Sequence, residues 1–357
     1  MNILHFANYG GPYKGNFIES LLGLSNKLSN LGNKMFLMLE KNSARGDWQS
    51  QVDKGGLPIR YLDCNKMSSI FELRKFIKKY NINIIHLHFF NFTQLIMFQL
   101  AITMIPKIKI FVHFHNHIFD NKLFLKRLLL KKTIICCCSE SVKNDLEMKG
   151  IKGKGIYAIE NAINFDRLDI INKDIQNNEL FATKKFKLLM FGASYERKGV
   201  DVVLDSIINS GLTDRIQLYI SLSVNNEYVK NKIIEKVGKF PSWIHLLPPC
   251  NEIGTYYRNV DAFISASREE GFCYALVEAA YCQKELIASK IPAQEDLKLP
   301  YAYWFENENI YELGKILNTI ICNRTLISKL EIQKDLVVKE YNLDVWIEKL
   351  INLYSQF

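Results

Sequence analysis

The chain has 357 residues, of which 48% are hydrophobic and 23% charged, so it is long enough for two ordinary globular domains. Its net charge of +9 fits an anionic membrane surface or a polyanionic substrate, but the basic residues form no nucleic-acid-binding motif, and we expect no nucleic acid partner. The cysteines show no C-x-x-C pair or disulfide framework, and the sequence has no signal-peptide pattern and no spanning apolar run. We therefore expect a reducing, cytoplasmic compartment.

The first half of the chain alternates short apolar runs with amphipathic stretches. Strands are predicted at 2–7, 34–39, 57–62, 82–88, 109–115, 133–138 and 156–159, and helices at 17–31, 68–80, 93–104 and 142–149. This alternation predicts a doubly wound parallel sheet, which binds ligands at the carboxyl ends of its strands. The loop 8–16 ends in Gly15 and Asn16, where a backbone can approach a phosphate or sugar. A simple tight turn explains these residues equally well.

Histidines gather at the ends of two predicted strands. His86 and His88 end one strand, and His113, His115 and His117 follow the next. We interpret four of them as partly buried, hydrogen-bonded imidazoles, and we expect no metal site because no ligand pair has helical spacing. Since side chains alternate along a strand, His115 at the strand's end is the best candidate to enter a binding cleft.

A basic amphipathic stretch covers residues 122–132. It interleaves leucines and phenylalanine with Lys122, Lys126, Arg127, Lys131 and Lys132. Such a helix could lie on an anionic membrane, or it could be an ordinary helix whose basic face is solvated and whose apolar face packs on the sheet. The sequence leaves both interpretations open.

The second half repeats the pattern after a polar segment, 166–185, that is predicted to be a linker. Strands are predicted at 186–191, 215–222, 243–247, 260–264 and 285–288. Helices are predicted at 200–209, 228–237, 252–260, from near 272, and at 310–322, 326–341 and 343–354. A second parallel α/β domain follows from this order.

The stretch 265–282 places Glu270 in a loop and Glu278 inside the following helix, about 10 Å from a start near Phe272. The free N–H groups of a helix N-terminus favour an anion. A carboxylate on each side of an anion site suits a nucleotide-sugar, and the pair Arg197 and Lys198 on another loop could neutralise a diphosphate. Spacing alone would equally allow a surface loop with acids.

Two stretches carry a resemblance to a known family. Residues 192–206, G-A-S-Y-E-R-K-G-V-D-V-V-L-D-S, and residues 270–279, E-G-F-C-Y-A-L-V-E-A, resemble the retaining GT-B glycosyltransferases of family four. The E-x7-E element of that family falls on Glu270 and Glu278, and its Lys-Gly pair on Lys198 and Gly199. Asn161-Ala162-Ile163 is similar to its domain junction, and the resemblance extends over essentially the whole chain.

The resemblance implies a GT-B fold with two Rossmann-like domains. It places an acceptor-binding domain at 1–165, a nucleotide-sugar-binding domain at 186–340, and a helix at 341–357 that crosses back to the first domain. It implies catalytic roles for His115 and Glu270, no metal or other cofactor, and front-face transfer with retention. The donor-binding residues that it implies are Gly15, Asn16, Arg197, Lys198, Gly271, Phe272, Cys273, Tyr274 and Glu278.

By this resemblance the chain uses a nucleotide-sugar, UDP favoured, to extend a glycan or glycolipid acceptor. We expect a lipid-linked oligosaccharide in surface polysaccharide synthesis, at the inner face of the plasma membrane. The chain departs from the family at Asn16, Ala193, Cys273 and Gln283, which bears on the donor sugar. A catalytically weak partner subunit, a protein or teichoic-acid glycosyltransferase, and an epimerase or phosphorylase are the alternatives. The sequence does not indicate an oligomeric state.

Overall fold

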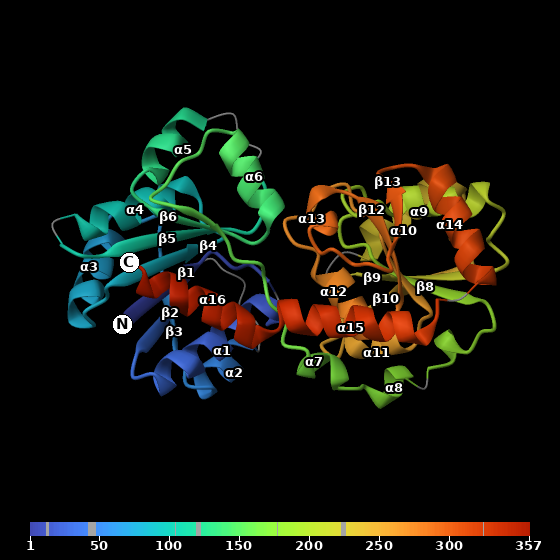
Figure 1. The fold of residues 1–357 in the computed structure, drawn as a ribbon, viewed down its shortest axis with the longest axis horizontal. Coiled ribbons are helices and arrows are strands. Elements are labelled where there is room, and N and C mark those ends of the chain that lie inside the picture. Colours follow the sequence, from blue (N-terminus) through green and yellow to red (C-terminus); the bar gives the residue numbers. More distant parts are fainter. Residues whose placement is uncertain are drawn as a thin grey trace. The chain divides into compact units, whose positions relative to one another are not determined.

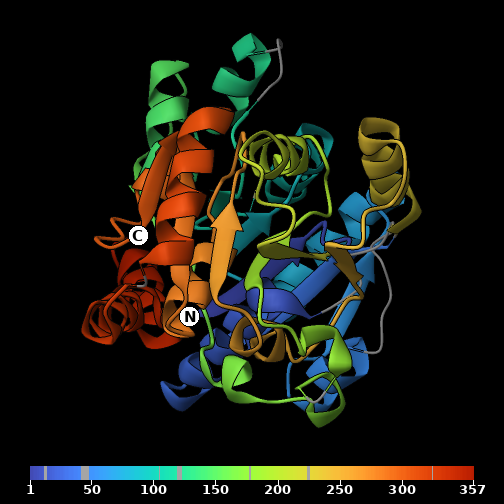
Figure 2. The same cartoon turned by 90° about the vertical axis from the view of Figure 1, so that its right-hand side faces the viewer.

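The computed structural model describes residues 1–11, 14–41, 48–103, 105–118, 123–176, 178–222, 226–323 and 325–357. They form two compact units, the first made of Met1–Ile163 with Leu343–Phe357 and the second of Asn164–Asn342. Figure 1 and the turned view in Figure 2 show strands alternating with helices in each unit. Within the described ranges, no helix is long and apolar enough to cross a membrane.

The first unit is built on a parallel sheet with the order β3-β2-β1-β4-β5-β6-β7 in its described part. Its strands are β1 (Asn2–Ala7), β2 (Lys34–Glu40), β3 (Ile59–Leu62), β4 (Ile84–His88), β5 (Lys109–Phe114), β6 (Ile134–Cys137) and β7 (Ile156–Ala158). Its helices are α1 (Gly15–Asn30), α2 (Trp48–Lys54), α3 (Ser68–Lys79), α4 (Phe92–Ile102), α5 (Leu123–Leu130), α6 (Glu140–Met148) and α16 (Leu343–Ser355). The order reverses between β1 and β4, the kind of position at which open α/β sheets bind ligands.

The core of the first unit explains why α16 belongs to it. Helix α1 buries Leu21, Leu24 and Leu28 at helical spacing against the sheet. Trp346 and Leu350 of α16 enter the same core. The last helix therefore packs on the first unit, as the resemblance implies.

The second unit has a parallel sheet with the order β10-β9-β8-β11-β12-β13 in its described part. Its strands are β8 (Phe186–Phe191), β9 (Ile216–Ser221), β10 (Ile244–Leu247), β11 (Ala262–Ser265), β12 (Glu285–Lys290) and β13 (Tyr303–Glu306). Its helices are α7 (Asp166–Asp169), α8 (Lys173–Gln176), the 3-10 turn η1 (Glu179–Phe181), α9 (Val200–Asn209), α10 (Asn226–Val237), α11 (Gly254–Arg258), α12 (Tyr274–Tyr281), α13 (Pro292–Glu295), α14 (Ile310–Cys322) and α15 (Ile327–Tyr341). The order reverses between β8 and β11, so the loops after these strands lie at a ligand-binding position. The predicted α/β class is confirmed, although β13 was not predicted.

The segment 166–185, predicted to be a linker, instead folds onto the second unit. Phe181 is buried and stacks on Tyr219 with ring centroids 4.8 Å apart, and Asp169 accepts a hydrogen bond from Arg258 at 2.7 Å. Leu168 is fully buried. The segment was predicted to be a linker because its composition is polar overall, and the few apolar residues that fix it, such as Leu168 and Phe181, do not change that composition.

Several predicted helix starts also differ, two of them next to candidate site residues. Helix α12 begins at Tyr274 rather than near Phe272, because Cys273 has φ −90° and ψ 80°, which is not helical. Helix α1 begins at Gly15 rather than after it.

Candidate functional site

Glu270 lies in the loop between β11 and α12, and its buried carboxylate is the centre of an ionic cluster. Its carboxylate accepts a hydrogen bond from Ser267 Oγ at 2.8 Å and is paired with the ammonium of Lys198. The guanidinium of Arg197 lies 3.3 Å from the second carboxylate oxygen. The Glu270 side chain is only 8% exposed. The structure thus brings together three residues that the sequence predicted, from loops that follow the neighbouring strands β8 and β11.

Gly199 makes the loop after β8 possible. Its φ of +64° is left-handed, and a Cβ at this position would lie 2.0 Å from the carbonyl oxygen of Ala266. Only glycine permits this approach, which places Lys198 beside the loop after β11. The backbone N–H of Arg268 donates to the carbonyl of Arg197 at 2.9 Å and joins the two loops.

Arg268 reinforces this junction through its side chain. The guanidinium donates to both carboxylate oxygens of Asp201, at 2.9 and 2.8 Å. The pKa of Asp201 is lowered although burial alone would raise it, because the hydrogen bonds and charge of Arg268 outweigh burial. This pair could not be recognised from the sequence, since Arg268 lies two residues before Glu270 and Asp201 lies on α9, far away in the chain.

Glu278 lies one turn inside α12 and is also buried, with its side chain 4% exposed. Arg167 of α7 pairs with one carboxylate oxygen, and the hydroxyl of Tyr257 donates to the other at 3.1 Å. Burial, followed by the charge of Glu278, raises the pKa of Tyr257 well above its usual value. The distance along the axis from Tyr274 is about 6 Å instead of the predicted 10 Å, because the helix starts later.

The residues between the two acids form the start of α12. Gly271, Phe272 and Cys273 are buried, and Tyr274 is partly exposed. The ring of Phe272 packs against that of Tyr274 at 5.0 Å between centroids. Burial, with a smaller contribution from Glu270, raises the pKa of the Cys273 thiol to about 11, so this thiol stays neutral near pH 7.

In the first unit, His115 lies just after β5 and is partly exposed. Its ring stacks on Phe89 with centroids 4.1 Å apart and on His113 with centroids 4.4 Å apart. The rings of Phe17 and His115 lie edge to face with centroids 5.6 Å apart. Because Phe17 belongs to α1, the predicted pair Gly15 and Asn16 at the start of this helix lies on the same side of the unit. Burial and the nearby His113 hold the pKa of His115 well below its usual value.

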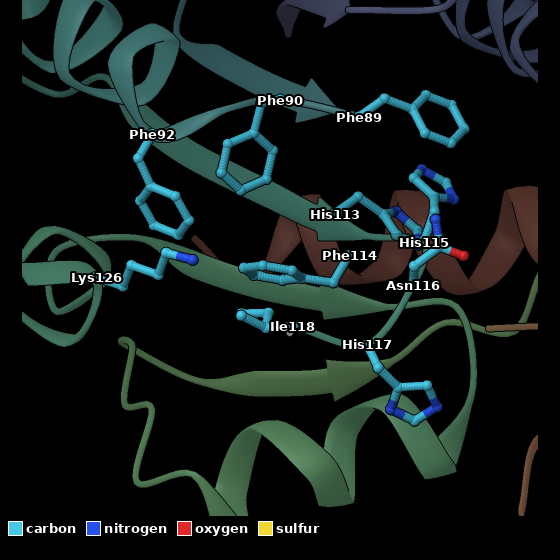
Figure 3. Close-up of a pocket in the computed structure, with 10 residues that line it drawn as sticks. All are labelled: Phe89, Phe90, Phe92, His113, Phe114, His115, Asn116, His117, Ile118 and Lys126. Atoms are coloured by element: carbon cyan, nitrogen blue, oxygen red, sulfur yellow. The ribbon is translucent and has the colours of Figure 1, made fainter. Parts of the chain in front are cut away.

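A pocket of about 550 Å³ lies next to His115 (Figure 3). His113 and His115 line one end and Lys126 of α5 the other. The Lys126 ammonium lies 4.6 Å from the ring centroid of Phe92, a cation–π distance. The remaining lining residues are Phe89, Phe90, Phe114, Asn116, His117 and Ile118. Aromatic faces combined with a cation suit a sugar that carries a negative group.

Helix α5 exposes apolar residues that an ordinary surface helix would bury. Phe124, Leu125 and Leu128 are 82%, 52% and 56% exposed, whereas Lys126 is buried. Lys131 and Lys132 follow the helix and are exposed. The side chains of Phe124, Leu125 and Leu128 therefore do not pack on the sheet. Lys122, which was predicted to belong to the basic face, lies outside the described residues.

The described residues that could hold a metal are histidines and a cysteine of the first unit. Three groups have ligand atoms within 4.8 Å of one another: His5, His86 and His88; His86, His113 and Cys136; His88, His113 and His115. Neutral imidazole and thiolate suit soft transition metals. The sequence did not reveal these groups, because residues from separate strands supply them.

Comparisons with known proteins agree with this architecture. The model of Glycosyltransferase Family 4 matches residues 22–167, and that of Glycosyl transferases group 1 matches residues 172–337. The chain is 28% identical over 174 residues to the uncharacterized glycosyltransferase MJ1178 of Methanocaldococcus jannaschii, covering 47% of this chain and 43% of that protein. It is 23% identical over 255 residues to Protein CapJ of Staphylococcus aureus, covering 65% and 59%. The matched part thus spans about half the length of these two proteins.

Among solved structures, the chain is similar to HepE of Anabaena in complex with UDP and glucose. The TM-score is 0.83 at 15% identity, and the match covers 100% of both chains. At this identity the likeness shows the fold. The first half of the chain thus matches the glycosyltransferase family 4 model and the second half the glycosyl transferases group 1 model, on two parallel-sheet, Rossmann-like units of the GT-B fold class.

Proposed function

We propose that this chain is a retaining glycosyltransferase that moves a hexose-type sugar from a nucleotide diphosphate, UDP favoured, to a sugar acceptor. The observation that carries the proposal is the buried carboxylate of Glu270 between Lys198 and Arg197, at the carboxyl ends of β8 and β11. A carboxylate so placed can accept hydrogen bonds from sugar hydroxyls, and the two cations can turn to a diphosphate. The structures of HepE with UDP and with UDP-glucose support the choice of donor.

In this proposal the residues Gly271 to Tyr274 receive the diphosphate, Glu278 receives the ribose, and His115 contacts the transferred sugar. The bond between the anomeric carbon and the phosphate oxygen breaks, and a bond to the acceptor oxygen forms on the same face. The acceptor proton passes to the leaving phosphate. Arg197 and Lys198 compensate the charge that develops there, so we propose transfer without a metal, which activity retained in EDTA would support.

The proposed acceptor is a lipid-linked oligosaccharide used for surface polysaccharide, held at the inner face of the plasma membrane. The aromatic pocket that ends at Lys126 suits its charged sugar, and the exposed Phe124, Leu125 and Leu128 beside two lysines suit an anionic bilayer. The similarity to CapJ supports a role in capsule synthesis.

The donor site is tested with Glu270→Gln and Lys198→Met in a screen of nucleotide-sugars for transfer. Each change is expected to lower kcat/KM by about 100-fold or more, since it removes a contact to the sugar or to the leaving group. Glu269→Gln, one residue away in the same loop, is the matched control and should stay close to wild type. Transfer that is undiminished in folded Glu270→Gln would refute the site.

Membrane docking is tested by flotation with vesicles that contain phosphatidylglycerol. Replacing Phe124, Leu125 and Leu128 by serine should reduce binding by about tenfold or more, because their exposed apolar surface is lost. Ile327→Ser, which changes an equally exposed apolar residue of the second unit, is the control. Binding of the triple variant at wild-type strength would contradict this orientation of α5.

Two observations favour a second candidate, a catalytically weak partner subunit. Arg167 and Tyr257 already satisfy Glu278, and Ala193 stands where the family carries arginine. The two candidates differ in donor binding, because a ligand that binds only the native state raises the melting temperature. No stabilisation by any nucleotide-sugar, together with a co-purifying glycosyltransferase, would favour the partner subunit.

A further inference from the structure

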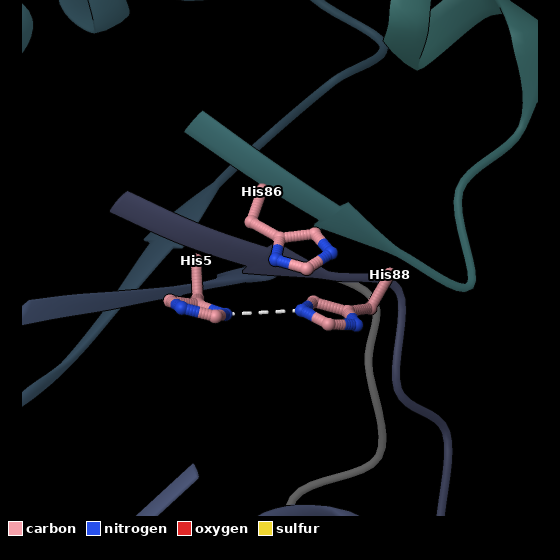
Figure 4. A group of neighbouring side chains, drawn as sticks. All are labelled: His5, His86 and His88. Carbon is pink, nitrogen blue, oxygen red and sulfur yellow. Dashed lines mark hydrogen bonds between the residues drawn. The ribbon is translucent and has the colours of Figure 1, made fainter. Parts of the chain in front are cut away.

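A chain of hydrogen-bonded rings leads from the C-terminal helix to the pocket of the first unit. Tyr354 Oη of α16 lies 3.3 Å from His5 Nε2. His5 Nδ1 lies 3.0 Å from His88 Nε2, the contact drawn as a dashed line in Figure 4. His88 Nδ1 then lies 3.1 Å from His115 Nε2. The same tyrosine oxygen lies 2.5 Å from His86 Nδ1. His115, the last ring of the chain, lines the pocket and keeps Nδ1 outside the chain.

The imidazoles in this row of hydrogen-bonded rings are neutral, and this couples their tautomers. His5, His86 and His88 are fully buried, and burial is the largest cause that lowers the pKa of each. A neutral imidazole carries one N–H donor and one bare acceptor nitrogen. If one ring in the chain reverses its tautomer, each neighbour must reverse as well to keep its hydrogen bond.

The distances select the direction of the chain. An O–H donor typically lies 2.5 to 3.0 Å from its acceptor and an N–H donor slightly farther, at about 2.7 to 3.2 Å. The 2.5 Å contact therefore fits the phenol of Tyr354 donating to His86 Nδ1. Because the phenol has one proton, the 3.3 Å contact is then His5 Nε2–H donating to the phenol oxygen. It follows that His88 Nε2–H donates to His5, and His115 Nε2–H donates to His88.

We infer that Tyr354, His5 and His88 are positioning residues that fix the tautomer of His115 and present its Nδ1 as a bare acceptor. A sugar hydroxyl can donate a hydrogen bond to that nitrogen, and a hydrogen-bond acceptor of the substrate cannot use it. This role toward the sugar rests on the proposed function. The tautomer itself does not, because it is set inside the first unit.

The tautomer is read directly from two-bond ¹H–¹⁵N correlations of histidine ring nitrogens in the full chain at pH 7. Tyr354→Phe leaves His5 Nε2–H without an acceptor in the core. The His5 proton should therefore move to Nδ1, and the direction of every hydrogen bond from His5 to His115 should reverse. We expect the ratio of tautomers at His115 to shift toward Nδ1–H by about tenfold or more. Tyr61→Phe, which removes a tyrosine hydroxyl bonded to Gln49 in the same unit, should leave it unchanged.

A second variant guards against a folding artefact. His5→Leu removes the acceptor of His88 and should shift His115 in the same direction. An unchanged ratio in folded Tyr354→Phe and His5→Leu would overturn the inference. A metal ion found on these nitrogens, removable by a chelator, would also overturn it, because a metal uses the lone pairs that the chain requires.

The activity of Tyr354→Phe separates this inference from the proposed function. Where the wild type transfers sugar, this variant should lower kcat by about tenfold with little change in the donor KM, as for loss of one acceptor at the reacting sugar. Normal kcat with a reversed tautomer would overturn the catalytic role of the chain. Absence of transfer in the wild type would refute the proposed function and leave the tautomer measurement standing.

Discussion

Mild acid should unfold the first unit before the second. His5, His86, His88 and His113 are at most 1% exposed and belong to the first unit. Burial lowers the pKa of His5 and of His113 to about 3 and that of the other two well below 6.5. Below about pH 6.5 the unfolded chain therefore binds protons at these histidines that the native unit does not bind. These rings cost no stability above about pH 6.5, and stability is lost progressively as the pH falls from 6.5 toward the lowered native pKa values.

The expected loss is large compared with the stability of a domain. Between pH 7.5 and 5.5, a histidine that stays neutral in the native state and titrates at 6.5 when unfolded costs about 1.4 kcal/mol. Four such rings cost about 5 kcal/mol, against a typical total of about 5 to 15 kcal/mol. Most carboxylates are still ionised at pH 5.5, so histidines dominate this interval.

The assay is hydrogen exchange followed by mass spectrometry, which reports opening free energies region by region. Amides of β4 and β5 should lose about 5 kcal/mol of protection between the two pH values, after correction for intrinsic exchange. Amides of β8 and β11 are the internal control, since the second unit contains one histidine, His245, which is only partly buried.

His113→Leu sharpens the test. Neither ring nitrogen of His113 has a hydrogen-bond partner within the described part of the chain, so the substitution removes a proton acceptor without breaking a bond. The dependence on pH should become shallower by about one proton. An equal loss in both units, or a slope unaffected by His113→Leu, would show that these imidazoles do not resist protonation.

Two further predictions concern the second unit. Gly199→Ala should lower the free energy of unfolding by about 3 kcal/mol or more, because the new Cβ would meet the Ala266 carbonyl in a left-handed backbone conformation. The control Gly211→Ala, with φ +66° in open space, should lower it by about 1 to 2 kcal/mol. Both values are read from urea unfolding. Arg167→Met leaves the buried Glu278 without its cation and should cost about 3 kcal/mol. Adding Glu278→Gln should restore part of that loss in melting temperature, and no restoration would show that the charge is compensated elsewhere.

Much of the fold could be predicted because its information is local. The buried strands β1, β4 and β8 are mostly apolar runs, and α1 has regular helical spacing, so each could be recognised from its own residues. The prediction of 166–185 as a linker was wrong because the information that places this segment is not local. A few anchors such as Phe181 fix it to the second unit through contacts with residues distant in the sequence.

The candidate site divides in the same way. Glu270 and Lys198 could be named in advance because each stands in a recognisable motif, and their pairing followed from the order of β8 and β11. Arg167 could not, since nothing in a polar segment indicates a partner on α12. The histidine chain was invisible for a related reason: its rings come from β1, β4 and β5, and only the pairing of these strands places them in one row.

Two buried acids of the second unit, Glu270 and Glu278, should respond differently to an anion. Lys198 and Arg197 can transfer from Glu270 to a diphosphate, because the carboxylate they leave can accept hydrogen bonds from sugar hydroxyls that arrive with the same ligand. Arg167 has no such exchange, since ribose hydroxyls are neutral and cannot replace its charge beside the buried Glu278. Arg167 should therefore stay in place and share Glu278 with the ribose. If the chain binds a nucleotide-sugar as proposed, the diphosphate rather than the nucleoside is the part of the donor that releases Glu270 for the sugar.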